Sequence, residues 1–144
     1  MHESFIQFNL RSEDEDGSLH IGIESSNSIY SSYEECYLWP ETLREFGEQL
    51  MSFPKSKEQE VVFRYGEESD ECFSFISIKI FVYNANGHSA LEVRMNSNKT
   101  NELKRVSNYC IQCEVAALNQ FGKKLIEWDP IKEKVFRFEF SRAG

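Results

Sequence analysis

Two cysteines in a Cys-x-x-Cys arrangement, Cys110 and Cys113, are the first candidates for chemistry in this chain. A zinc site would need both thiolates on one side and two further ligands. Cys36 and Cys72 are available, but neither lies in a cysteine pair or beside a histidine. Residues three apart in a strand point to opposite faces, and a thioredoxin-like pair would open a helix directly. We therefore expect reduced thiols, and no metal or other cofactor.

The other catalytic residue types show no recognisable pattern. The three histidines are scattered over a terminus, a strand and a turn (His2, His20 and His88). Phosphate-binding glycine loops, nucleophile elbows and helical His-Glu-x-x-His motifs are absent from the sequence. We expect a protein that is not an enzyme, although an active site built from distant residues stays open.

Negative charge is concentrated in two short segments. They comprise Glu13, Asp14, Glu15 and Asp16, and then Glu67, Glu68, Asp70 and Glu71. The whole chain has 24 acidic and 16 basic residues, a net charge of −8. Such a charge disfavours binding to nucleic acid and favours a cationic protein partner, with tyrosines as contact anchors if they are exposed (Tyr30, Tyr33 and Tyr37). The alternative is that both segments only keep the protein soluble.

Length and composition indicate one globular domain over residues 1–144. Hydrophobic residues make up 40% of the chain and twelve are phenylalanines, which is enough for a substantial core. The sequence has neither a membrane-length apolar run nor a basic segment before an apolar one near its N-terminus. We expect a cytoplasmic location and no membrane contact, while the oligomeric state stays unknown.

Hydrophobic periodicity predicts eight strands and two helices. Alternation indicates a hairpin of 5–11 with 18–25, and further strands at 29–38, 60–65, 72–83, 91–95, 104–114 and 135–141. Helical spacing predicts one helix from Pro40 to Phe53 and another from about Val115 to Trp128, each stopped by a proline. Within 72–83 the apolar positions change parity, which predicts a bulge near Phe75–Ile76 or burial on both faces.

The two helices carry the same pattern, Leu-x-x-Phe-Gly-x-x-Leu, 75 residues apart. Phe46 and Gly47 in the first correspond to Phe121 and Gly122 in the second, and similar strands follow both helices. We therefore predict an internal duplication with halves 5–66 and 73–140. The fold class is α+β: two similar β-β-β-α-β halves, mostly antiparallel sheet, with two amphipathic helices packed on it.

The paired glycines indicate close packing. A glycine inside a helix costs about 1 kcal/mol relative to alanine, so two at equivalent positions require a cause. Gly47 and Gly122 both follow a stripe leucine by four residues and lie on or beside the buried face. We expect the helix backbone to approach the sheet or the other helix there. Alanine could still stabilise the helix if it fits.

The segment from Tyr37 to Phe46, followed by strands and the second Leu-x-x-Phe helix, resembles a group of bacterial proteins. The group comprises the small, acidic immunity proteins that accompany polymorphic toxins, and the similarity covers about residues 28–128. The resemblance implies an α+β protein that neutralises a cognate toxin by binding it, the partner being a basic toxin domain. These proteins share no catalytic signature, so no residue role is transferred. The alternative is a small ligand-binding domain or enzyme with a pocket between sheet and helices.

Overall fold

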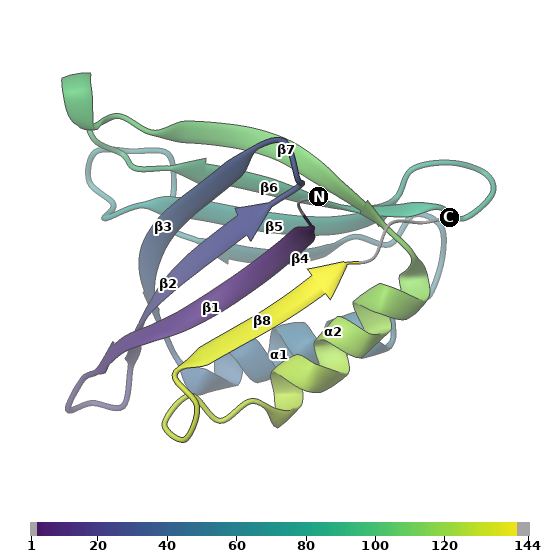
Figure 1. The fold of residues 1–144 in the computed structure, drawn as a ribbon, viewed down its shortest axis with the longest axis horizontal. Coiled ribbons are helices and arrows are strands. Elements are labelled where there is room, and N and C mark those ends of the chain that lie inside the picture. Colours follow the sequence, from purple (N-terminus) through teal and green to yellow (C-terminus); the bar gives the residue numbers. More distant parts are fainter. Residues whose placement is uncertain (1–2, 141–144) are drawn as a thin grey trace.

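A computed structural model describes residues 3–140 and confirms the α+β fold (Figure 1). The elements follow the chain as β1 (Ser4–Glu13), β2 (Leu19–Ser26), β3 (Ser31–Leu38), α1 (Pro40–Met51), β4 (Val61–Tyr65), β5 (Phe75–Val82), β6 (Ser89–Asn96), a short 3₁₀ turn (Asn101–Leu103), β7 (Val106–Cys113), α2 (Val115–Glu127) and β8 (Val135–Phe140). The predicted order β-β-β-α-β therefore occurs twice. His2 and Ser141, which the sequence analysis placed in a terminus and a strand, lie outside the described residues.

The strands form two antiparallel sheets of four, and each half of the chain contributes to both. One sheet has the order β3-β2-β1-β8, which we call sheet A, and the other has the order β4-β5-β6-β7, which we call sheet B. The last strand of each half leaves its own three strands and pairs with the first strand of the other half. β8 thus occupies beside β1 the position that β4 occupies beside β5.

Two local details differ from the predictions. Strand β5 begins at Phe75 rather than Cys72, and it pairs with β4 and β6 without any register shift. The predicted bulge at Phe75–Ile76 is therefore wrong, and burial on both faces is correct. The guanidinium groups of Arg64 and Arg94 lie over the Phe75 ring, at 5.3 and 5.6 Å from its centroid, and cover it on the outer face. The irregularity in register lies instead in β1, between Leu10 and Ser12.

The third strand begins at Ser31 and not at Ile29, because a side chain organises the preceding turn. The carboxamide oxygen of Asn27 accepts hydrogen bonds from the backbone N–H groups of Ile29 (3.0 Å) and Tyr30 (2.8 Å). Ser28 adopts a positive φ of 77° in the same turn. These bonds satisfy the backbone locally, so the chain joins the sheet only afterwards.

The two helices cross each other at the paired glycines. A Cβ atom added to Gly122 would lie 2.5 Å from the carbonyl oxygen of Gly47, and one added to Gly47 would lie 2.7 Å from Cγ1 of Ile126. The expected close approach is therefore made to the other helix. The side-chain amide of Asn119 also donates to the carbonyl oxygens of Leu50 (2.8 Å) and Phe53 (2.9 Å), which ties α2 to the end of α1.

Aromatic rings fill the space between the helices and the sheets. Phe121 is fully buried, and its ring centroid lies 5.4–6.1 Å from those of four other phenylalanines, Phe46, Phe136, Phe138 and Phe140. The inner faces of both sheets complete this core with aliphatic side chains. Within residues 3–140, neither helix has the length and apolar character needed to cross a membrane.

Candidate protein-binding surface

Strand β3 presents alternate residues to the solvent and to the core. Tyr33, Glu35 and Tyr37 lie on the outer face of sheet A, whereas Cys36 and Leu38 are buried on the inner face. β3 is an edge strand of sheet A, and the segment before β5 contacts it through Phe73 and Ser74. This position brings residues from both halves of the chain together.

The C-terminal end of β3 carries an aromatic cluster formed by His20, Tyr37 and Phe73. His20 is the register partner of Tyr37 on β2, and the two rings stack at 4.6 Å with an angle of 19° between their planes. Phe73, from the segment before β5, lies 5.4 Å from the Tyr37 ring. The side chains of Tyr37 and Phe73 remain 42% and 45% exposed, so the cluster forms an accessible apolar surface.

The two acidic segments approach this aromatic cluster from different directions. Ser12, just before the segment Glu13–Asp16, pairs with His20 in the sheet, and Asp14 to Asp16 then form the turn between β1 and β2. The segment Glu67–Glu71 ends two residues before Phe73. Both segments lie at the left of Figure 1, with the C-terminal part of β3 between them. The fold thus places on the same side of the molecule two charge clusters that are more than fifty residues apart in the chain.

The carboxylates in these segments are mostly free of cations. In the part of the chain that the structure describes, Glu68 is their one ion-paired member, with Arg94 at 2.7 Å. Asp14 and Asp16 instead accept hydrogen bonds from the Ser18 hydroxyl, at 3.2 and 2.7 Å. The bonds from Ser18 lower the pKa of Asp16. Most of these carboxylates therefore have no intramolecular cation beside them and can attract one from a partner.

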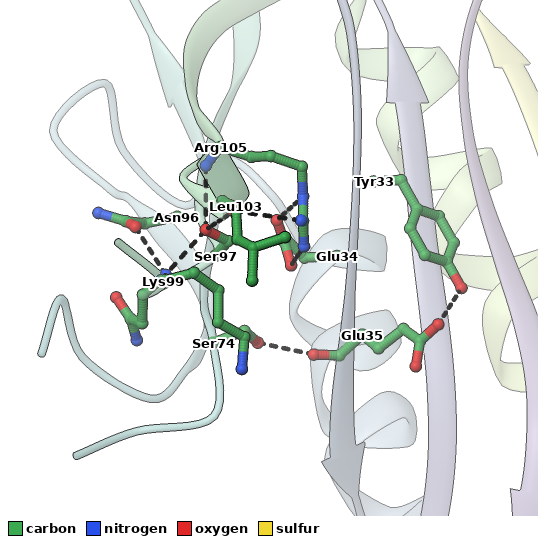
Figure 2. Close-up of polar contacts among 10 residues, drawn as sticks. Tyr33, Glu34, Glu35, Ser74, Asn96, Ser97, Lys99, Leu103 and Arg105 are labelled. Carbon is green, nitrogen blue, oxygen red and sulfur yellow. Dashed lines mark hydrogen bonds and ion pairs between the residues drawn. The ribbon is translucent and has the colours of Figure 1, made fainter. Parts of the chain in front are cut away.

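A hydrogen-bonded network extends along the outer face from the aromatic cluster to Tyr33. The Tyr33 hydroxyl donates to Glu35 at 2.8 Å (Figure 2), and the other Glu35 oxygen lies 2.7 Å from Nε2 of His20. The hydrogen bond from Tyr33 is the main cause that lowers the pKa of Glu35. Burial and that same bond to a carboxylate raise the pKa of Tyr33 to about 12. Tyr33 and Glu35 are consequently held in fixed positions.

The structure separates the three tyrosines that the sequence grouped together. Tyr37 belongs to the aromatic cluster and Tyr33 to the adjoining network, but Tyr30 lies in the turn before β3, at the opposite end of that strand. Tyr30 is 64% exposed, and its ring is 6.5 Å from that of Tyr109. His20 and Phe73 were not among the candidate residues. His20 was recognisable only as a residue on the outer face of a strand.

Cys110 and Cys113 point to opposite faces of β7, as the strand alternation predicts. Cys110 is exposed on β7 and Cys113 is buried. Burial raises the pKa of both Cys113 and Cys36 to about 12, so these thiols stay protonated at neutral pH. Within residues 3–140, no group of three His, Cys, Asp or Glu side chains is arranged to hold a metal ion.

The edges of the two sheets meet along β3 and β7. The Arg105 guanidinium binds both carboxylate oxygens of Glu34, at 3.1 and 3.2 Å, and the Tyr109 hydroxyl contacts the hydroxyls of Ser25 (2.5 Å) and Ser32 (2.8 Å). Figure 2 shows the contact between Arg105 and Glu34. An open groove of about 620 Å³ runs between the two strands beside Arg105.

The comparisons with known proteins find a distant structural likeness only. No protein-family model and no curated protein match the sequence. Among solved structures, the chain is similar to the one described as the plant transcriptional regulator PBF-2, at 11% sequence identity and a TM-score of 0.48. That similarity covers 89% of this chain and 78% of the other.

Proposed function

We propose that this protein is a cytoplasmic, non-enzymatic binding protein that neutralises a basic bacterial toxin domain through the surface around the aromatic cluster. The observation that carries the proposal is the placement of the two acidic segments on either side of His20, Tyr37 and Phe73. The Lys99 ammonium lies 5.7 Å from the Phe73 ring centroid, and the acidic segments outnumber this one cation. Acidic segments on both sides of exposed rings suit a partner that presents arginine or lysine beside apolar side chains.

The two parts of this surface have different roles in binding. The acidic segments increase the rate of encounter by long-range attraction, which salt screens over about 10 Å. Tyr37 and Phe73 keep the bound partner in place, because aromatic residues near the centre of an interface account for much of its binding free energy. The fixed Tyr33–Glu35–His20 network lowers the conformational cost of binding at this face.

The test measures association of the purified protein with the product of the neighbouring gene, at several salt concentrations. Changing Glu13, Asp14, Glu15 and Asp16 to lysine should slow association at low salt by about tenfold or more, with little effect at high salt. The control variant makes the same change in net charge at exposed positions away from the aromatic cluster, with lysine at Glu48, Glu58, Glu114 and Glu127.

Truncation of the aromatic side chains tests the other part of the surface. Tyr37→Ala and Phe73→Ala should leave the association rate nearly unchanged and increase the dissociation rate at least tenfold, as expected for a residue that contributes about 1.4 kcal/mol or more. If the lysine-substituted segment and its control associate at the same rate, and both aromatic variants dissociate like the parent protein, the partner binds elsewhere or not at all.

A further inference from the structure

β3 and β7 are edge strands, so each has main-chain groups on one side that no neighbouring strand pairs. In an antiparallel strand, the N–H and C=O of one residue point to the same side, and successive residues point to opposite sides. The Arg105 carbonyl accepts from the N–H of Ser97, in line with the β6–β7 ladder, so odd-numbered residues of β7 face β6. The even-numbered residues, from Val106 to Gln112, therefore face the free edge.

The same argument identifies the free edge of β3. The Ser74 hydroxyl, from the segment just before β5, donates to the Glu35 carbonyl at 2.6 Å (Figure 2), so the main-chain carbonyl of Glu35 points away from β2. Ser31, Tyr33 and Tyr37 share its parity and point the same way. An unpaired edge of this kind can pair with another chain, and proteins usually cover or interrupt it.

Side chains cap part of these edges and leave another part free. The Glu35 carbonyl is capped by Ser74, and the Cys110 carbonyl on β7 accepts from the Asn27 amide at 3.2 Å. Within the described part of the chain, no loop or side chain caps the edge-facing main-chain groups of five other residues, Ser31, Tyr33, Val106, Asn108 and Gln112. The first three of these line the groove of about 620 Å³. Uncapped main-chain groups of both edge strands are therefore present on the walls of this groove.

The walls of the groove also carry opposite charges. Glu24, the register partner of Tyr33, stands on the side of sheet A, and Lys104 stands at the start of β7. Neither Glu24 nor Lys104 takes part in an ion pair within residues 3–140. The other two charged residues that line the groove, Arg105 and Glu34, form an ion pair with each other. The wall from Ser31 to Glu34 has a length of about 13 Å, enough for about four extended residues.

We propose that this groove binds an extended segment of a partner protein by adding it as a strand between β3 and β7. The main chain of the segment bonds to Ser31 and Tyr33 on one wall and to Val106 and Asn108 on the other. A basic side chain of the segment faces Glu24, and an acidic one faces Lys104. This mode of binding does not require the partner to be a toxin, and it uses neither acidic segment.

The probe is a synthetic peptide of about six residues that alternates threonine and valine and carries one lysine and one glutamate. Titration of the protein with this peptide, followed by amide NMR, should shift the signals of Ser31, Tyr33, Val106 and Asn108 and slow their hydrogen exchange. The same peptide with alternate backbone nitrogens methylated should bind at least tenfold more weakly, because its donors are blocked while its side chains are unchanged.

A variant of the protein tests the other partner in these bonds. Val106→Pro removes one edge N–H at the first residue of β7, a position where proline is tolerated, and should weaken peptide binding about tenfold. Val106→Thr keeps the N–H and should bind like the parent protein. Lysine at Glu13–Asp16 should leave peptide binding unchanged, which separates this proposal from the proposed function.

Three results would overturn the inference. They are the absence of shifts at millimolar peptide, equal binding of the methylated peptide, and shifts confined to other residues. A second copy of the chain is the other possible occupant, and it would appear as a dimer that forms with increasing concentration and is abolished by Val106→Pro.

Discussion

Single residues at the helix crossing show how a propensity argument can fail. In an isolated helix, alanine is more favourable than glycine by about 1 kcal/mol. At Gly122, however, an added Cβ would lie 2.5 Å from a backbone oxygen and 2.7 Å from the Cβ of Leu50. Backbone atoms of a packed helix cannot move aside as the end of a flexible side chain can. The helices therefore require glycine at this contact.

We predict that Gly122→Ala destabilises the protein, because the overpacking at the crossing outweighs the gain in helix propensity. Overpacking costs about 1–3 kcal/mol, and the gain in helix propensity offsets about 1 kcal/mol of that cost. Urea unfolding should therefore show a net loss of up to about 2 kcal/mol in unfolding free energy. Gln120→Ala, at an exposed position of the same helix, is the control and should change stability little. An increase in stability for Gly122→Ala would show that the helices separate freely.

Tyr33 provides a prediction of pH dependence. Its pKa is raised from 10.0 to about 12, so the folded state favours the protonated phenol. This stabilisation is complete below pH 10 and is lost as the pH rises from 10 to 12. Absorbance of the phenolate should show that Tyr33 titrates near pH 12, beside Tyr65 and Tyr109, whose pKa values burial also raises. Tyr33→Phe should remove this titration and part of the loss of stability above pH 10.

The same substitution affects Glu35. The hydrogen bond from Tyr33 is the largest cause of the lowered pKa of Glu35, so Tyr33→Phe should raise that pKa. Carbon NMR of the Glu35 carboxyl measures the change directly. An unchanged Glu35 titration would mean that the hydrogen bond is absent in solution.

At the scale of elements, the contact between β3 and β7 depends on a buried carboxylate. The side chain of Glu34 is 6% exposed, whereas that of Arg105 is 59% exposed. Solvent therefore reaches the guanidinium, and the pair contributes less than a fully buried one. The cost of breaking it comes mainly from leaving the carboxylate without its donors.

We predict that Arg105→Ala lowers the unfolding free energy by about 1–3 kcal/mol, the usual cost of an unsatisfied buried group. Adding Glu34→Gln should recover part of the loss, because an uncharged amide costs less to bury. Lys104→Ala, next in the chain and without an ion pair among residues 3–140, is the control for both variants. Equal stability of Arg105→Ala and Lys104→Ala would contradict the structural role of this contact.

The whole molecule is held together by the exchange of the last strand between its halves. β4 pairs with β5 and β8 pairs with β1, while α1 packs against α2. Each half on its own would expose one face of its helix and leave its fourth strand without a sheet. The predicted duplication adds a second expectation. Residues 5–66 should superpose on 73–140 by an approximate two-fold rotation, with Phe46 on Phe121 and Phe63 on Phe136.

We predict that fragments 1–70 and 71–144 are unfolded as separate monomers and form the native fold when mixed. Circular dichroism and amide NMR of each fragment and of the equimolar mixture measure this directly. Cutting the chain within the loop between β4 and β5 breaks no strand, so the mixture is a fair test. A folded, monomeric fragment would show that the halves are independent units.

The elements themselves were predictable from the sequence because the forces that define them act locally. Each of these signals lies within a window of about fifteen residues. They are the alternation of the strands, the leucine and phenylalanine stripe of each helix, and the prolines that end the helices. The same pattern in both halves was sufficient to predict the β-β-β-α-β order. One error arose from local bonds that a pattern does not show, those that Asn27 makes before β3. The other, the bulge at Phe75–Ile76, arose because arginines from two neighbouring strands cover the Phe75 ring.

The proposed binding surfaces were decided only by the tertiary structure. The acidic segments and Tyr37 were visible in the sequence, but no local pattern places Phe73 against Tyr37 or Tyr30 at the other end of the strand. Those positions depend on the pairing of β4 with β5 and β8 with β1, and on how two sheet edges meet. Such contacts join residues far apart in the chain, and hydrophobic periodicity carries no information about which strands become neighbours.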